Sequence, residues 1–278
     1  MADMNDTTMM LDGALVQHGT SNDRIYLMDL GSADPSILVP DLLELARTNN
    51  YGKIFAKIPA KNSKAFLDAG FLIEAKADKL FHGKVDGLFL GLFLDKNRYE
   101  ESLKKEYENI CTVALAKEST DEPTHESVRL CTTEDAQTMA KIYGRVFDSY
   151  PFPIDNPKFI VKSMEEGTVF AGIETDGELV ALASAECSVQ HDKRYAEMTD
   201  FATLPDARGN GYALQLLSFL EQEIKEKGIL TAYTIARAIS PGMNVTFGKA
   251  DYQFGGRLHN NTDIAGNIES MNVWFKSL

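Results

Sequence analysis

Residues 197–213, EMTDFATLPDARGNGYA, combine a strand-like segment, a proline and a glycine-rich turn that opens a helix. Glycines at a strand-to-helix turn let backbone amides approach an anion closely, and the free N–H groups and dipole of the helix start favour negative charge. The turn Arg208-Gly209-Asn210-Gly211 therefore predicts a pyrophosphate site. A tight turn without any ligand remains the alternative at this point.

Two other phosphate-binding motifs fit this stretch poorly. A P-loop has a Lys-Ser/Thr pair after its glycines, whereas Tyr212-Ala213 stands here. A dinucleotide fold has G-x-G-x-x-G after the first strand of parallel βαβ units. Here the turn follows apolar runs at 168–174 and 178–189 that Asp176-Gly177 separates, which is typical of an antiparallel hairpin.

The second half of the chain alternates short apolar runs with amphipathic segments. In the helix after the glycine turn, apolar residues recur at helical spacing and the opposite face is rich in glutamate and lysine. The proline-rich stretch 149–157 ends one helix and leads into the next. We expect strands at 128–131, 168–174, 178–189, 195–204, 229–236, 252–258 and 271–276, and helices at 133–147, 158–166, 214–227 and 243–249.

The polar segment KESTDEPTHE at 117–126 predicts a linker between two units, an N-terminal α/β unit at 1–120 and a catalytic domain at 127–278. The first unit echoes the later part of the second, because Phe66, Ala69 and Phe71 can be laid on Phe247, Ala250 and Tyr252. The first unit is either a degenerate copy of half of the second unit or similar to it by chance. We expect helices at 37–47, 63–69 and 97–115, and strands at 53–58, 72–81 and 88–94.

Charge argues against polyanionic partners. The 278 residues include 41 acidic and 28 basic ones, which gives a net charge of −13 at pH 7. That field repels phosphate backbones and anionic lipid surfaces, so we expect no nucleic acid and no membrane partner. An acidic balance suits a cationic small molecule, although acidic surfaces also serve solubility alone.

The cysteines and the apolar runs indicate a cytoplasmic location. Cys111, Cys131 and Cys187 are widely spaced and form no C-x-x-C pair, which predicts free thiols and neither a disulfide framework nor a zinc site. The acidic N-terminus lacks the pattern of a signal peptide, and no run approaches the roughly 18 to 20 apolar residues of a membrane span.

The motif R-x-x-G-x-A at Arg208–Ala213, within this order of strands and helices, resembles the coenzyme A loop of the GNAT superfamily of N-acetyltransferases. The likeness covers residues 127–278. More closely, the strings EMTDFATLP, TAYTIARAIS, GMN and NIESMNVWFK resemble β-lysine N-acetyltransferases, and this likeness extends over the N-terminal half. It implies an α/β acyltransferase fold, with a mixed, largely antiparallel sheet flanked by helices.

The resemblance implies acetyl-CoA as co-substrate and assigns residues to it. The strand before the loop would pair through its backbone with the pantetheine arm, and the loop amides would hold the pyrophosphate. Asn244 would contact the same arm, although a helix cap is nearly as good a reading of this residue. The implied coenzyme residues are Phe201, Ala202, Thr203, Arg208, Gly209, Asn210, Gly211, Tyr212, Ala213 and Asn244.

Acetylation of an amine needs a proton acceptor, because an alkylammonium has a pKa near 10.4. Glu197 occupies the position of the general base in some members of the superfamily, and burial on a strand would raise its proton affinity. Many members carry a tyrosine general acid where this chain has Phe247. Tyr233 and Tyr252 could replace it, or the thiolate could leave unaided, since a thiol has a pKa near 8.5. No metal is implied.

For the acceptor, the resemblance implies the ε-amine of β-lysine, and the product would be Nε-acetyl-β-lysine, a zwitterionic osmolyte. β-Lysine has one carboxylate and two amines, so its site should contain a cation that can bind a carboxylate with two hydrogen bonds, as arginine does, and separate acidic groups for the amines. Another small amine as acceptor, or a non-catalytic acetyl-CoA sensor, remains an alternative. The candidate substrate residues are Tyr150, Phe152, Glu186, Asp200 and Arg237, and Arg145 and Glu269 are further charged candidates.

Overall fold

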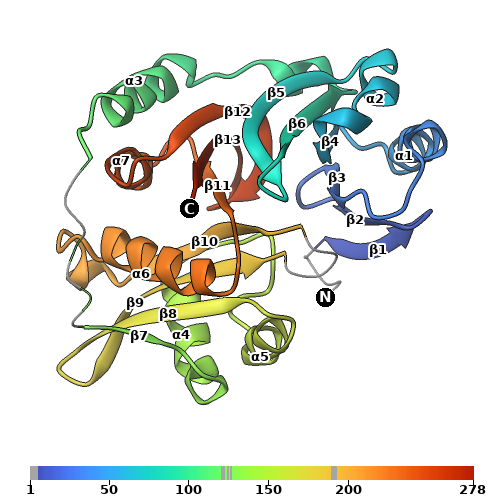
Figure 1. Ribbon diagram of the computed structural model, residues 1–278. Helices are drawn as coiled ribbons and strands as arrows, with labels where there is room; N and C mark the ends of the chain where they lie inside the picture. Colours follow the sequence, from blue (N-terminus) through green and yellow to red (C-terminus); the bar gives the residue numbers. More distant parts are fainter. Residues whose placement is uncertain (1–5, 120–122, 124, 126, 189–192) are drawn as a thin grey trace.

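The computed structural model describes residues 6–119, 123, 125, 127–188 and 193–278, arranged around one long, curved β-sheet (Figure 1). The strand order is β1-β2-β3-β4-β6-β5-β12-β13-β11-β10-β9-β8-β7. Among the strands that the structure describes, only β3–β4 and β10–β11 pair in parallel, and the other neighbours are antiparallel. The predicted mixed, largely antiparallel α/β fold is thereby confirmed.

The second half follows the predicted order of elements. Asp176 and Gly177 make the expected hairpin turn, with φ of +53° and +80°. Asn156 caps α5, and its side chain accepts from the backbone of Lys158. The elements are β7 Val128–Leu130, α4 Ala136–Val146, α5 Pro157–Glu165, β8 Val169–Thr175, β9 Glu178–Cys187, β10 Tyr195–Thr203, α6 Tyr212–Glu226, β11 Thr231–Arg237, α7 Pro241–Lys249, β12 Gln253–Ile264 and β13 Asn267–Ser277.

Two expectations for this half need adjustment. The closing hairpin is longer than predicted, since β12 and β13 continue to Ile264 and back from Asn267. Residues of the hairpin extension are polar and interrupted by a bulge, with φ of +38° at Asn260, so the extension does not alternate as a strand pattern should. The predicted end of β9 at Val189, and much of the proposed linker, lie outside the described residues.

The first half contains three strands that the sequence analysis missed. Asp12 and Gly13, with φ of +48° and +87°, turn β1 into β2 as Asp176-Gly177 turns β8 into β9. The predicted helix at 97–115 is a short 3-10 turn at Lys96–Tyr99 followed by α3. The elements are β1 Thr7–Leu11, β2 Ala14–Gly19, β3 Arg24–Asp29, α1 Pro35–Asn49, β4 Lys53–Pro59, α2 Lys64–Asp68, β5 Leu72–Phe81, β6 Val85–Phe93 and α3 Lys104–Leu115.

The halves join through one antiparallel contact between β5 and β12, with Ala75 opposite Gly256. Gly256 has φ of +140°, and a Cβ there would meet the Ala75 Cα at 2.7 Å and, closer still, the backbone oxygen of Glu74. A glycine is therefore required where the two half-sheets meet.

The two halves share a topology. In the first, β3-α1-β4-α2-β5-β6 gives the strand order β3-β4-β6-β5, and in the second, β10-α6-β11-α7-β12-β13 gives β10-β11-β13-β12. The helix ends also correspond: the N–H of Phe71 donates to Phe66 O at 3.1 Å, and that of Tyr252 donates to Phe247 O at 3.1 Å. The N-terminal unit therefore repeats the strand order of β10–β13 in the second half.

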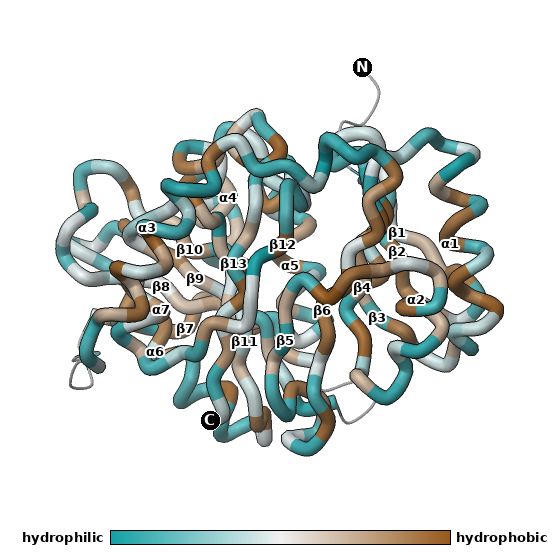
Figure 2. The backbone as a smooth tube through the Cα atoms, turned by 90° about the horizontal axis from the view of Figure 1, so that it is seen from above, coloured by the Kyte–Doolittle hydropathy of each residue, from teal (hydrophilic) through white to brown (hydrophobic). Residues whose placement is uncertain are grey.

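Helices pack on both faces of the second half of the sheet. Residues of α3, α6 and α7 form a core with β8–β11, while α4 and α5 pack on the opposite face near β8 and β9. In α1, buried Leu38, Leu42 and Ala46 lie at helical spacing, and Figure 2 shows hydrophobic and hydrophilic residues alternating along this helix. The inner faces of the halves meet in an aromatic cluster that includes Tyr26 and Tyr233.

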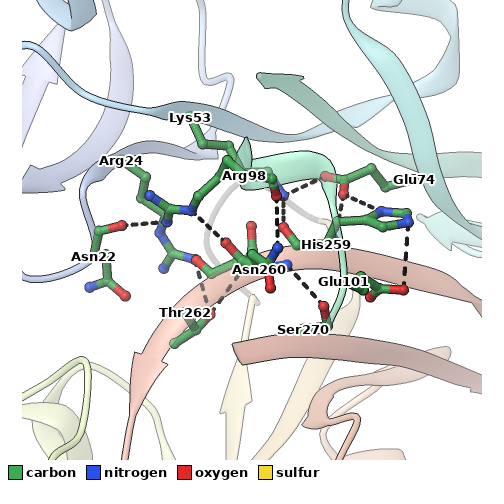
Figure 3. Close-up of polar contacts among 11 residues, drawn as sticks. Asn22, Arg24, Lys53, Glu74, Arg98, Glu101, His259, Asn260, Thr262 and Ser270 are labelled. Carbon is green, nitrogen blue, oxygen red and sulfur yellow. Dashed lines mark hydrogen bonds and ion pairs between the residues drawn. The ribbon is translucent and has the colours of Figure 1, made fainter. Parts of the chain in front are cut away.

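A buried polar network also ties the first half to the β12–β13 hairpin (Figure 3). Lys53 pairs with Glu74 at 2.8 Å, and both side chains are almost fully buried. Lys53 also donates to the backbone of His259, and Arg98 donates to the backbone of Asn260, each at 2.8 Å. The bonds from Lys53 and Arg98 to the backbone of β12 cross between the halves, so this network helps to fix how the halves face each other.

All three cysteines are free thiols, as predicted, with Cys111 buried and the other two partly buried. Within the described part of the chain, no helix has the length and apolar character needed to cross a lipid bilayer.

Candidate active site

The inner faces of the two halves enclose a cavity of about 1170 Å³ that runs to the start of α6. Sites for drug-sized ligands hold roughly 300–1,000 Å³, so this cavity has room for a coenzyme arm together with a small acceptor. Both halves line it, because the curved sheet brings β3 and β4 opposite β10 and β11.

The glycine turn borders the cavity at the N-terminus of α6. Gly211, with φ of +72°, is the N-cap, and no side chain caps the helix. A Cβ at Gly209 or Gly211 would meet no atom within 4 Å, so the space above these amides is open. This 15-residue helix has no side-chain cap, its first amides are free, and the space above them is open, so its N-terminus can bind a pyrophosphate group.

The strand before the turn separates from its parallel neighbour. β10 pairs with β11 only from Tyr195 to Glu197, whereas residues 198–203 pair with β9 or bulge. The free edge of β10 can therefore pair with an extended amide-bearing chain. Of the residues predicted there, Phe201 and Thr203 line the cavity, while the Ala202 side chain packs in the core near α4.

Three carboxyl groups lie together beside this opening. Glu186 on β9 is directly opposite Glu197 on β10, and a bulge with φ of +56° turns Asp200 to line the same cavity. The Glu186 side chain is exposed to the cavity. Partial desolvation at the cavity wall, followed by repulsion from Glu197 and Asp200, raises the pKa of Glu186 above its ordinary value.

Glu197 is held by a chain of hydrogen bonds from both halves. Tyr233, its register partner on β11, donates to Oε2 of Glu197, and Nζ of Lys57 on β4 donates to the Tyr233 hydroxyl at 2.7 Å. Burial raises the pKa of Glu197 above its ordinary value, against the opposing effects of Lys57 and the Tyr233 hydrogen bond. A carboxylate of raised proton affinity beside the opening can accept a proton.

The proline-rich loop carries its two aromatic residues to the cavity. The Tyr150 hydroxyl donates to Asp200 at 2.7 Å, and Ser184 donates to the other oxygen at 2.6 Å. Burial raises the pKa of Asp200, although both hydrogen bonds oppose the shift. Phe152 stacks on Phe159 with ring centroids 6.3 Å apart and also lines the cavity. The loop thus forms one wall near the acids.

Two predicted site residues have other partners. Arg237 borders the cavity, but Glu269 holds its guanidinium with two bonds of 2.8 and 2.7 Å. Asn244 is fully buried: its amide nitrogen donates to Arg237 O and Ser240 O, and its oxygen accepts from Asn272 and Trp274. These four bonds give Asn244 a structural role and leave no polar atom for a coenzyme.

Sequence reasoning missed the contribution of the first half. Arg24 and Tyr26 on β3 and Lys57 on β4 all line the cavity. The hairpin signal Asp12-Gly13 was available to identify β1 and β2, and through them β3. Of the two alternative tyrosines, Tyr233 touches Glu197, whereas Tyr252 lies in the core behind α7.

The model of the acetyltransferase (GNAT) family matches residues 134–240, which include Glu197 and the glycine turn. The β-lysine N(6)-acetyltransferase of Methanococcus maripaludis is 34% identical over 271 residues, which cover 96% of this chain and 97% of the relative. That of Methanosarcina mazei is 34% identical over 66% of each chain, and N-acetyltransferase YodP of Bacillus subtilis is 30% identical over 95% and 96%. The chain therefore belongs to the β-lysine N(6)-acetyltransferase family of GNAT N-acetyltransferases.

Proposed function

We propose that the chain transfers an acetyl group from acetyl-CoA to the ε-amine of β-lysine, which gives Nε-acetyl-β-lysine. The observation that carries this proposal is the 34% identity to a β-lysine N(6)-acetyltransferase along 96% of the chain. The aligned length includes both halves, and both halves line the cavity. The acidic groups on its wall suit an acceptor with two amines.

Acetyl-CoA supplies an activated acetyl thioester when bound. The amides of Gly211, Tyr212 and Ala213 and the dipole of α6 would hold its pyrophosphate, and the free edge of β10 at Phe201–Thr203 would pair with its pantetheine amides. The acyl end would then lie toward Glu197, where β10 leaves β11.

Glu197 accepts the proton of the attacking amine. An alkylammonium at pH 7 is almost wholly protonated, so the reaction needs a neighbouring base. Lys57 and Tyr233 position the carboxylate through their hydrogen bonds. Phe247 is buried and offers no proton, and a thiolate with a pKa near 8.5 can leave without an acid.

The acceptor assignment predicts discrimination between lysine isomers. A site that pairs a carboxylate and a 3-amino group should penalise their misplacement, because unmatched buried polar partners cost about 1 to 3 kcal/mol each. We expect kcat/KM for β-lysine to exceed that for α-lysine by at least about tenfold. Thiol release measured with both lysines and a polyamine tests this. Equal turnover of the lysines, or faster turnover of the polyamine, would reject β-lysine but keep acetyl transfer.

The first half should bind no second coenzyme. Its equivalent of the glycine turn ends in Asp34, whose carboxylate accepts from the backbone N–H of Ser36 at 2.8 Å and from its hydroxyl at 2.7 Å. The position of an anion at the start of α1 is thus filled by the chain itself. We expect one acetyl-CoA per chain in titration calorimetry, and a stoichiometry of two would contradict this.

A further inference from the structure

Arg24 is a buried cation on the wall that the first half contributes to the cavity. It lies on β3, and only 4% of its surface is exposed. Its guanidinium carbon lies 5.3 Å from the Tyr26 ring centroid and 5.8 Å from that of Phe55. These aromatic rings support the charge on the inner face of β3 and β4, the face that is turned toward β10 and β11.

The protein satisfies the Arg24 guanidinium on one side only. Nη1 donates to the backbone oxygen of Asn261 and, at 3.0 Å, to the hydroxyl of Thr262, as Figure 3 shows for Thr262. Nε is buried without a hydrogen-bond partner. Within the described residues, no carboxylate pairs with Arg24, and burial lowers its pKa to about 10. A buried guanidinium with an unused donor is costly unless an acceptor completes it.

The other cations on the cavity wall already have partners or other tasks. Arg237 donates from both Nε and Nη2 to the carboxylate of Glu269. Lys57 donates to Tyr233 in the chain that positions Glu197. Arg208 is exposed at the coenzyme turn, where its Nε donates to the Thr203 backbone. Among the cavity-lining residues that the structure describes, Arg24 is thus the buried arginine that is committed neither to a carboxylate nor to the coenzyme turn, and it can bind an acceptor anion.

The charges on the cavity wall are separated. Glu186, Glu197 and Asp200 lie on the side of the second half. Arg24 lies on the side of the first half, within electrostatic range of Glu197, and the carboxylate of Asp29 on the same strand is paired with Lys193. An acceptor with a carboxylate at one end and an amine at the other matches this order. Its amine end would face Glu197 and the acetyl group, while its carboxylate would face β3.

We propose that Arg24 binds the carboxylate of the acceptor amino acid, so that the first half of the chain supplies acceptor specificity. The proposal rests on the proposed function, and it names the subsite that separates an amino acid from a simple diamine. It also gives the first half a function in place of the coenzyme site that it lacks.

The test compares β-lysine with 1,4-diaminopentane, which is β-lysine without its carboxylate. We expect Arg24→Gln to reduce the ratio of kcat/KM for β-lysine over the diamine by about 10- to 100-fold, the usual loss of a charge-assisted pair. The change should appear mainly in KM for β-lysine. Arg24→Lys keeps the charge without the fork and should reduce the ratio by a smaller factor.

Arg98→Gln is the matched control. Arg98 is also a buried arginine that holds the first half to β12, through Asn260 O at 2.8 Å (Figure 3). Its side chain also contacts Asn22 and Asp23, and it is not among the residues that line the cavity. It should lose stability and keep the substrate ratio. Acetyl-CoA binding by calorimetry verifies that each variant is folded.

The outcomes are distinct. A wild-type preference for β-lysine that survives in folded Arg24→Gln, or in Arg24→Lys if the glutamine variant does not fold, would overturn the role of Arg24 alone. A wild-type preference for the diamine would overturn both the carboxylate subsite and the β-lysine assignment. A ratio lost equally in Arg98→Gln would show that the geometry between the halves, and not the Arg24 charge, sets specificity.

Discussion

Replacing Glu197 by glutamine is expected to lower kcat by about 10²- to 10⁴-fold, the usual contribution of general-base catalysis. Glutamine keeps the size of the side chain, and its oxygen can still accept from the Tyr233 hydroxyl. It cannot accept the proton of the attacking amine. Acetyl-CoA affinity should change little, because the coenzyme turn lies at the other end of β10. Steady-state kinetics with saturating acetyl-CoA measure the effect.

Glu186→Gln is the matched control, since Glu186 is directly opposite Glu197 and lines the same cavity. Desolvation and the neighbouring carboxylates raise the pKa of Glu186, so the neutral amide of glutamine is a mild change at this position. We expect a loss below about tenfold in kcat. A larger loss in Glu186→Gln than in Glu197→Gln would transfer the role of base to Glu186.

The pH dependence of the reaction follows from the raised pKa of Glu197. A general base works when ionised, so activity is present above its pKa and is lost as the pH falls through it. Because burial raises the pKa of Glu197, the acid limb of the kcat/KM profile should lie above that of an exposed glutamate. In Glu197→Gln this limb should disappear, and raising the pH should partly restore the rate as more amine becomes neutral.

The fold of the second half could be read from the sequence because its elements are locally encoded. Asp176-Gly177, Asn156 and the apolar spacing of α6 each specify a turn, a cap or a face within a few residues. The joint between the halves is different. It depends on pairing between Ala75 and Gly256, far apart in the chain, and neither periodicity nor composition specifies a partner at that distance.

The candidate site also has residues that the sequence could suggest and residues that only the folded structure brings together. Glu197 and the glycine turn belong to one strand and the helix that follows it, so a single stretch of sequence suggested both. Arg24 and Lys57 reach the cavity only because the sheet curves and turns β3 and β4 toward β10. The bond from Lys57 to Tyr233 crosses 176 positions of the chain. Residues brought together by sheet curvature carry no local signal.

Replacing Gly211 by valine should abolish measurable acetyl-CoA binding. Gly211 has φ of +72° at the N-cap of α6, a conformation that β-branched residues avoid. Its Cβ position is open space, so a side chain there would not clash with the protein but would occupy the room above the helix amides. The valine should therefore block the approach of pyrophosphate to those amides and also strain the turn.

Gly228→Val separates the two effects. Gly228 follows the other end of the same helix, with φ of +82° and no atom within 4 Å of its Cβ position. Its valine variant should suffer a similar backbone strain, of about 1 to 3 kcal/mol, far from the cavity. We expect both variants to melt at lower temperature, while calorimetry detects acetyl-CoA binding in Gly228→Val only. Wild-type affinity in folded Gly211→Val would rule out the turn as the pyrophosphate site, because an anion held by these amides cannot share their space with a side chain.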